Sequence, residues 1–164
     1  MADRSDYQAF VASRWPRLLR LAYLLTQDWQ SAEDLVQTAL VKAWFAWPRV
    51  TGDPEPYLRK IIVNTHSSWW RRAWRSREIT SEAVPDRPGP DHTAHTGERD
   101  LVWDALGRLP DRQRTAVVLR FYEDLPEAQV AELMHCSVGT VKSQTSRALA
   151  KLRVDPAVLT AQKG

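Results

Sequence analysis

The sequence predicts an all-α protein made of two small helical domains joined by a flexible linker. Three observations support this fold class. Apolar residues recur at helical spacing over most of the chain, no segment shows sustained strand alternation, and an acidic, proline-rich stretch separates two helical halves. The chain has 164 residues, of which 43% are hydrophobic and 26% charged, as is ordinary for a folded protein of one or two domains.

The first domain is predicted over residues 1–77 and contains three helices. The first helix has a broad apolar face that is broken near Pro16. The second is expected to be capped by Ser31, with Asp34 three residues on at the capping-box position. The third is expected to begin after Asp53, a residue type that caps helices well.

Residues 78–98 are predicted to form the flexible linker. Their net charge is −4, against +5 for residues 1–77 and +2 for residues 99–164. An acidic segment with few large apolar groups cannot bury enough surface to fold. A long surface loop within a single domain is the alternative. The second domain is predicted over residues 99–155 and is followed by a C-terminal tail, residues 156–164.

The second domain is predicted to contain a helix-turn-helix. Val130 and Ala131 suit its first helix, which is expected to end at Met134, and Val138 and Val141 are expected to pack the second helix against the first. The second helix of such a unit enters the major groove with its N-terminal residues against the base edges. An ordinary amphipathic helix in a bundle is the alternative. Small, polar or basic residues supply the groove-facing side: Ser137, Gly139, Thr140, Lys142, Ser143, Ser146 and Arg147.

The third helix of the first domain carries a second pattern typical of nucleic-acid binding. Between Arg59 and Arg77 there are six basic residues, no acidic residue and three tryptophans. Basic side chains bind phosphate, and aromatic rings stack on unpaired bases. The alternative is that the tryptophans belong to the core and the basic face is only solvated. The side chains expected to contact DNA are Trp70, Arg71, Arg72, Trp74 and Arg75. Trp70 and Trp74 are expected roughly opposite the seam that contains Trp69.

With these features the chain resembles the extracytoplasmic-function (ECF) sigma factors of bacterial RNA polymerase, and actinobacterial members in particular. "AEDLVQTALVKAW" at 32–44 is similar to their polymerase-binding helix, and "PYLRKIIVNTHSSWWRRAWR" at 56–75 to their promoter-melting, minus-ten-reading segment. Residues 109–153 are similar to their minus-thirty-five-reading domain. The resemblance implies that the protein directs core RNA polymerase to promoter DNA and initiates transcription. It also implies that an anti-sigma factor is a further partner, since many family members are held by one.

The resemblance implies roles for individual residues. Glu33, Asp34, Gln37 and Lys42 match the contact with the polymerase clamp helices, although Glu33 and Asp34 also suit the start of a helix. Asn64 matches the start of a loop that captures a flipped minus-ten base. Three polar neighbours are expected to line that pocket, namely Thr65, His66 and Ser67, although Thr65 also fits the buried seam.

Three positions depart from the family's pattern. Where this chain has Gln144 and Thr145, the family more often has a basic residue followed by an aliphatic one. Gln144 joins the expected minus-thirty-five contacts because glutamine can pair with adenine. Thr145 falls on the apolar seam, so looser packing of the recognition helix is expected. His135 stands where glycine is common, which leaves the turn geometry open.

Several other classes of protein are disfavoured. No apolar run approaches the ~18 residues of a membrane span, and the first ten residues contain no signal-peptide core, so no membrane insertion and a cytoplasmic location are expected. The single cysteine, Cys136, permits no internal disulfide. The four histidines show no metal-ligand spacing, so neither a metal nor another cofactor is expected.

Two other functions stay open from the sequence. One is a stand-alone helix-turn-helix regulator that binds duplex DNA as a dimer, which leaves the helix at 32–44 unexplained. The other is a nuclease that uses Glu33, Asp34 and His66. The sequence shows no second carboxylate cluster, no phosphate loop and no nucleophile-and-base pair, so the protein is not expected to be an enzyme.

Overall fold

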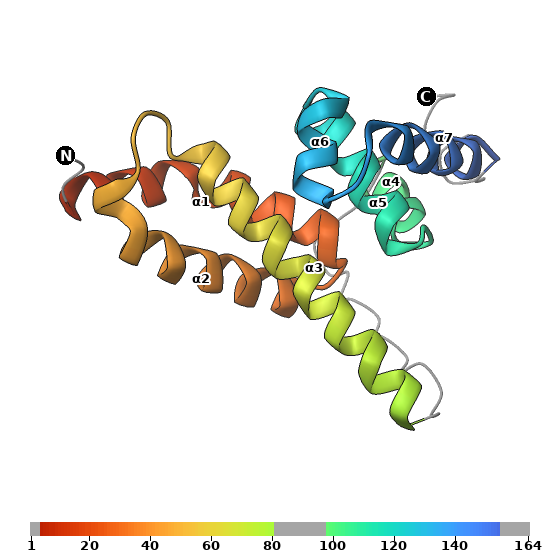
Figure 1. The fold of residues 1–164 in the computed structure, drawn as a ribbon, viewed down its shortest axis with the longest axis horizontal. Coiled ribbons are helices and arrows are strands. Elements are labelled where there is room, and N and C mark those ends of the chain that lie inside the picture. Colours follow the sequence, from red (N-terminus) through yellow and green to blue (C-terminus); the bar gives the residue numbers. More distant parts are fainter. Residues whose placement is uncertain (1–3, 81–97, 155–164) are drawn as a thin grey trace. The chain divides into compact units, whose positions relative to one another are not determined.

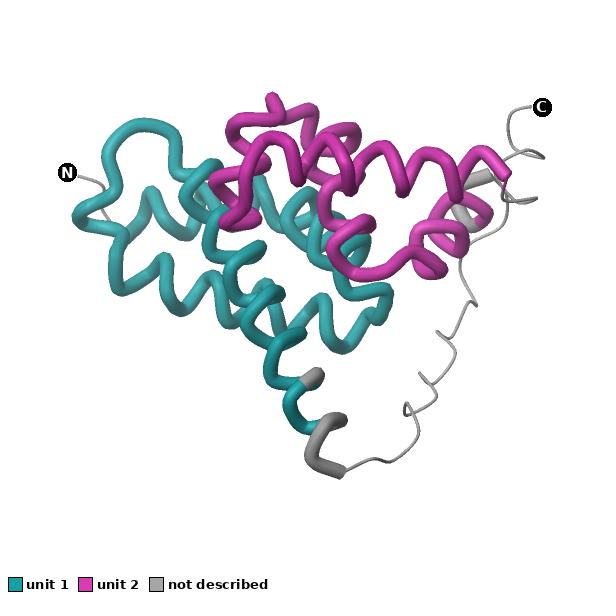
Figure 2. Tube along the Cα trace, turned by 45° about the vertical axis from the view of Figure 1, so that its right-hand side comes forward, with its two compact units in different colours: residues 1–90 teal, residues 91–164 magenta. Residues whose placement is uncertain are grey.

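The structure is a computed structural model that describes residues 4–80 and 98–154. Within those two ranges the chain forms helices and no strand, so the predicted all-α class is confirmed. The chain divides into two compact units, residues 1–90 and 91–164 (Figure 2). Each unit contains its own buried core and is considered by itself.

The first unit is built from α1 (Arg4–Thr26), α2 (Trp29–Ala46) and α3 (Glu55–Thr80), with a 3-10 turn at Trp47–Arg49 after α2. Figure 1 shows α1 and α2 as an antiparallel pair that α3 crosses. α3 continues three residues beyond the predicted domain end at residue 77. The core consists of Leu18, Leu21, Ala22, Leu25, Ala32, Leu35, Val36, Ala39, Leu40, Ala43, Trp47, Leu58, Ile62 and Val63.

The helix starts differ in part from the sequence prediction. α1 runs through Pro16 without interruption, and Pro16 is exposed, where the apolar face was expected to be broken. The predicted cap of α2 was wrong. Asp28, not Ser31, caps this helix, and its carboxylate accepts from the backbone N–H of Ser31 at 2.9 Å. At α3 the prediction was right, since the Asp53 carboxylate accepts from the Glu55 N–H at 3.0 Å.

Polar and aromatic contacts hold the helices of the first unit together. Arg17 Nε lies 3.0 Å from Glu55 Oε1, which ties α1 to the first turn of α3. Near the start of α1, the Tyr7 hydroxyl donates to the carbonyl of Leu40 at 2.7 Å. The Tyr7 ring meets the ring of Trp44 edge-on, with centroids 5.0 Å apart. Burial raises the pKa of the Tyr7 hydroxyl, which stays a hydrogen-bond donor.

The second unit contains α4 (Glu98–Gly107), α5 (Asp111–Val117), a π-helical turn at Val118–Tyr122, α6 (Glu127–Met134) and α7 (Val138–Val154). α7 packs against both α5 and α6. The core consists of Trp103, Ala105, Leu106, Leu109, Ala116, Val117, Val118, Leu119, Leu125, Val130, Ala131, Met134, Val141 and Ala148.

An arginine is buried where α4 turns into α5. The Arg114 guanidinium donates to the carbonyl of Leu109 at 3.2 Å and to Asp111 Oδ1 at 3.4 Å. The side chains of Arg114 and Asp111 are only 2% and 7% exposed. A buried charge is tolerated only when it is paired and hydrogen-bonded, so this pair fixes the turn that precedes the helix-turn-helix.

The helix-turn-helix forms as predicted, apart from one residue. α6 ends at Met134, and His135 adopts the left-handed conformation, with φ 53° and ψ 48°, that glycine usually supplies at this place. Val141 is fully buried. The packing expected of Val138 was wrong. This side chain is 38% exposed, because it stands at the first residue of α7, ahead of the seam.

Candidate polymerase- and nucleic-acid-binding sites

One face of α2 is exposed along most of its length. Glu33, Asp34 and Gln37 all lie on it, exposed, as a polymerase contact requires. Val41 and Phe45 continue the same face at spacings of four residues and are 56% and 74% exposed. Neither Val41 nor Phe45 was among the predicted contacts, although both lie outside the helical periodicity of the buried residues of α2, which was a signal of exposure. Large apolar side chains left exposed beside polar ones are typical of an interaction surface.

Lys42 also lines a second surface. Its side chain is exposed on α2, and its Nζ donates to the Thr65 hydroxyl of α3 at 3.2 Å. The two helices enclose a pocket of about 440 Å³ at this place. The pocket combines two basic groups, an amide, three hydroxyls and an indole ring, from Thr38, Lys42, Ile61, Asn64, Thr65, Ser68, Trp69 and Arg72.

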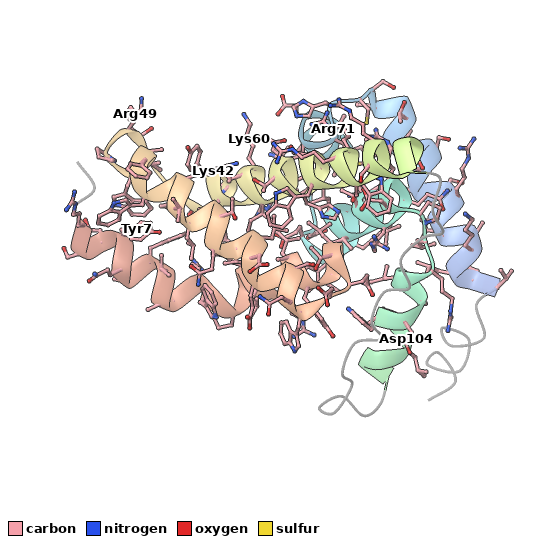
Figure 3. All side chains as sticks on the ribbon, turned by 90° about the horizontal axis from the view of Figure 1, so that it is seen from below. Tyr7, Lys42, Arg49, Lys60, Arg71 and Asp104 are labelled. Carbon is pink, nitrogen blue, oxygen red and sulfur yellow. The ribbon has the colours of Figure 1, made fainter. Side chains whose placement is uncertain are left out.

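The outward face of α3 is basic. Lys60, Arg71, Arg72 and Arg75 are all exposed, and Figure 3 shows Lys60 and Arg71 on one side of the helix. Asn64, Ser67 and Trp70 are half-buried beside this basic row. The side chains of Trp74 and Arg77 lie outside the described part of the structure.

The region around Asn64 differs from the loop that was expected there. α3 is one continuous helix of 26 residues, and Asn64 lies in its middle. Thr65 and His66 are each only 5% exposed, so His66 faces the core and Thr65 reaches the pocket wall. The unbroken run from Leu58 to Trp70 contains no helix breaker, which accounts for the helix.

The outward face of α7 is small and polar at its start and basic further on. Gly139, Lys142, Ser143, Ser146 and Arg147 are exposed, whereas Thr140 and Gln144 are half-buried at its edge. The space outside Gly139 is open, since an added Cβ would meet only Ser137 Oγ at 3.7 Å.

The two hydroxyls before and after Gly139 serve the helix itself. Ser137 Oγ accepts from the Thr140 N–H at 3.1 Å and lies 3.0 Å from the Thr140 hydroxyl. Ser137 therefore caps α7, a role that was not predicted for it. The Thr145 hydroxyl on the seam is buried without a hydrogen-bond partner, and the looser packing expected there stays a prediction.

Comparison with known proteins explains why these surfaces occur in one chain. Residues 10–76 match the family described as Sigma-70 region 2, and residues 99–152 match Sigma-70, region 4. The chain belongs to the sigma-70 family. The first match spans the α2 face, the pocket and the basic face of α3, and the second spans the helix-turn-helix. The predicted family is thereby confirmed.

Several named relatives cover nearly the whole of this sigma factor. It is 37% identical to the RNA polymerase sigma-E factor of Streptomyces coelicolor over 93% of this chain and 87% of the relative. It is 30% identical to the ECF RNA polymerase sigma factor SigL of Mycobacterium tuberculosis over 92% of this chain and 86% of that protein. Both relatives are sigma factors, which identifies this chain as one as well.

Solved structures agree with the fold. The sigma factor RpoE of Bartonella quintana, in complex with the anti-sigma factor NepR, superposes with a TM-score of 0.68 at 28% identity, covering 92% of this chain and 98% of RpoE. CnrH, solved in complex with the cytosolic domain of CnrY, is 23% identical with a TM-score of 0.62, over 97% of this chain and 90% of CnrH, and supports the fold alone.

Neither a metal site nor a membrane span is found in the part of the sigma factor that the structure describes. No three His, Cys, Asp or Glu side chains within residues 4–80 and 98–154 are placed to hold a metal ion together. No helix in those ranges is long and apolar enough to cross a membrane. The predicted linker at 78–98 falls largely outside these ranges and stays a prediction.

Proposed function

We propose that this sigma factor binds core RNA polymerase through α2, reads the minus-ten element with α3 and reads the minus-thirty-five element with α7. The observation that carries the proposal is the basic face of α3 beside a polar pocket, in the same unit as an exposed α2 face. Such a protein acts in the cytoplasm and initiates transcription without catalytic chemistry of its own.

The α2 face suits a protein partner. Its N-terminal half is acidic at Glu33 and Asp34, and its C-terminal half is apolar at Val41 and Phe45. A partner that covers it gains both charge complementarity and burial of apolar surface. Phe45→Ala is expected to weaken polymerase binding more than any polar change on this face, because a buried aromatic anchor contributes most to an interface.

The pocket between α2 and α3 suits an unpaired nucleotide. The Lys42 and Arg72 side chains can bind its phosphates, and the amide of Asn64 can bond to a base edge. The Trp69 ring offers a stacking surface on the same wall. Lys42, which was predicted to contact the polymerase, is therefore also assigned to the nucleic acid, as its hydrogen bond to Thr65 at the pocket supports.

The exposed residues of α7 suit the major groove of a duplex. Gly139 leaves open space where the helix comes close to DNA, and Lys142 and Arg147 provide the charge. The anti-sigma factor in the complex of the 28%-identical relative supports a protein of that kind as a third partner of this chain.

Run-off transcription with core polymerase tests the proposed function. Core polymerase plus this protein is expected to give promoter-dependent transcripts, and Phe45→Ala is expected to remove them unless its concentration is raised. A stand-alone dimeric regulator would instead bind a short duplex tightly without polymerase and give no transcript. Tight binding of the wild-type protein to a short duplex without polymerase, or the absence of a transcript with core polymerase, would overturn the proposal.

A further inference from the structure

An ion pair joins the two helices of the helix-turn-helix at the end that faces DNA in the proposed function. Lys142 Nζ of α7 lies 3.8 Å from Glu127 Oε2 of α6. Glu127 is the first residue of α6, and Lys142 is on the exposed face of α7 beside Gly139 and Ser143. The side chains are 65% exposed at Lys142 and 37% exposed at Glu127, so both are open to an incoming ligand.

The position of Glu127 favours a carboxylate that stays in place. It lies in the first turn of α6, where the helix dipole stabilises a negative charge. A phosphate that approaches Lys142 must therefore compete with a carboxylate that is already within 4 Å, and it is repelled by that carboxylate as well. A guanine edge differs from a phosphate, since its O6 and N7 atoms are neutral acceptors that a carboxylate does not repel in this way.

We propose that Glu127 is a specificity-determining residue of the minus-thirty-five reading helix. It restrains Lys142 so that backbone phosphate alone engages this lysine poorly, and the contact is made in full only where the base sequence offers acceptors. This inference rests on the proposed function of α7. It describes a repulsive element that penalises the wrong DNA, in addition to the attractive groups of the recognition helix.

The first experiment measures binding of the full chain to a random-sequence duplex by fluorescence anisotropy over a series of salt concentrations. Glu127→Gln is expected to bind this duplex about two- to fivefold more tightly, the range of an exposed ion pair. It is also expected to steepen the plot of log K against log salt by about 0.9, the effect of one additional phosphate contact. The melting temperature of Glu127→Gln is expected to stay within a degree or two of the wild-type value, which separates the effect on binding from loss of structure.

Two control variants separate the pair from general charge. Glu132→Gln removes the same charge from another exposed position of α6 and is expected to leave the salt slope unchanged. Lys142→Gln is expected to abolish the effect of Glu127→Gln in the double variant. Equal slopes for Glu127→Gln and Glu132→Gln, or an undiminished effect in the Lys142→Gln background, would overturn the proposal.

The second experiment repeats run-off transcription with holoenzyme on promoters that carry single-base changes in the minus-thirty-five element. Glu127→Gln is expected to reduce discrimination at one base pair, by about the same two- to fivefold factor, and to leave the minus-ten preferences unchanged. If the wild-type holoenzyme is active and Glu127→Gln discriminates as well as the wild type, the specificity role of Glu127 is rejected and the proposed function is not. An inactive wild-type holoenzyme would reject the proposed function, while the duplex measurements would still decide whether Glu127 restrains Lys142.

Discussion

α3 and α7 both present basic groups, but the two helices suit different forms of DNA. The outward face of α3 is dominated by long side chains, with Lys60, Arg71, Arg72 and Arg75 exposed and a pocket at one edge. The outward face of α7 begins instead with small residues and open space at Gly139. Long basic and aromatic groups can follow a flexible single strand, whereas a small leading face lets a helix approach the bases of an intact duplex.

The supports of the two helices differ as well. α3 is tied to α1 by partly exposed ion pairs, with Arg14 and Arg17 side chains 42% and 50% exposed around Glu55. The unit that holds α7 depends on the buried pair of Arg114 and Asp111. Exposed pairs stabilise by little and buried ones are costly to break, so breaking the buried pair is expected to destabilise the second unit far more than breaking an exposed pair destabilises the first.

The largest effect is expected from Arg114→Ala. This change removes a buried guanidinium together with its contacts to Asp111 and to the Leu109 carbonyl, and breaking such a buried pair costs about 3–5 kcal/mol. Hydrogen exchange of the full chain measures the loss for each unit separately, and protection is expected to fall in α4–α7 alone.

The matched control is Arg112→Ala, which changes an exposed arginine of the same helix. It is expected to alter the free energy of unfolding by at most about 0.5 kcal/mol. A loss of protection for Arg114→Ala that spread equally to α1–α3 would contradict the independence of the two units.

The next largest effect distinguishes the two reading helices by their ligands. Arg71→Ala is expected to weaken all promoters alike and to reduce the salt dependence of holoenzyme binding by roughly one unit of slope, because this residue lies in the basic row of α3. Arg147→Ala is expected to cost about 1–3 kcal/mol, centred on one minus-thirty-five base pair, if it reads a base edge. Transcription on a panel of single-base promoter changes at several salt concentrations measures both effects. The distinction fails if Arg71→Ala changes base preference while Arg147→Ala weakens all promoters equally.

Features that depend on local spacing could be predicted from the sequence, and features that depend on contacts between helices could not. The ends of α6 and the burial of Val141 followed from the apolar periodicity. Asp28 and Ser31 are both good caps, and packing decided between them, since Trp29 enters α2 and stacks on Tyr23 with ring centroids 4.3 Å apart.

The candidate site shows the same limit. Lys42 stands in a segment that resembles a polymerase-binding helix, but only the packing of α2 against α3 shows that it meets Thr65. The exposed arginines of α3 and the outward residues of α7 were predictable because helical spacing alone fixes which face they share. The ion pair of Lys142 with Glu127 was not predictable, because it joins two helices through a turn whose geometry His135 left open.

A smaller effect, and a stabilising one, is expected from Thr145→Val. The Thr145 hydroxyl is buried on the seam of α7 without a partner, and valine has nearly the same shape. Removing this unsatisfied group is expected to stabilise the second unit by about 1 kcal/mol. Thr140→Val is the control on the same helix. Its hydroxyl is bonded to Ser137, so this change is expected to give no gain. Equal melting temperatures for Thr145→Val and Thr140→Val would show that the seam is not under-satisfied.

The smallest effect is expected at the ion pairs of the first unit and completes the contrast with Arg114. Glu55→Gln keeps the shape of the side chain but removes the charge that faces Arg17 Nε at 3.0 Å and Arg14 Nε at 3.7 Å. Both arginines are about half exposed, so water screens the attraction, and the expected loss is about 0.5–1 kcal/mol.

Urea unfolding of Glu55→Gln, Arg17→Gln and the double variant measures the coupling between the two charges, with Arg20→Gln on α1 as an exposed control. The coupling is expected to shrink as salt is raised, because only a solvent-exposed pair is screened. A coupling above about 2 kcal/mol that did not respond to salt would mean that α3 is held by a desolvated ion pair. The turn before α5 is held by such a pair as well, so the difference between the two units would disappear.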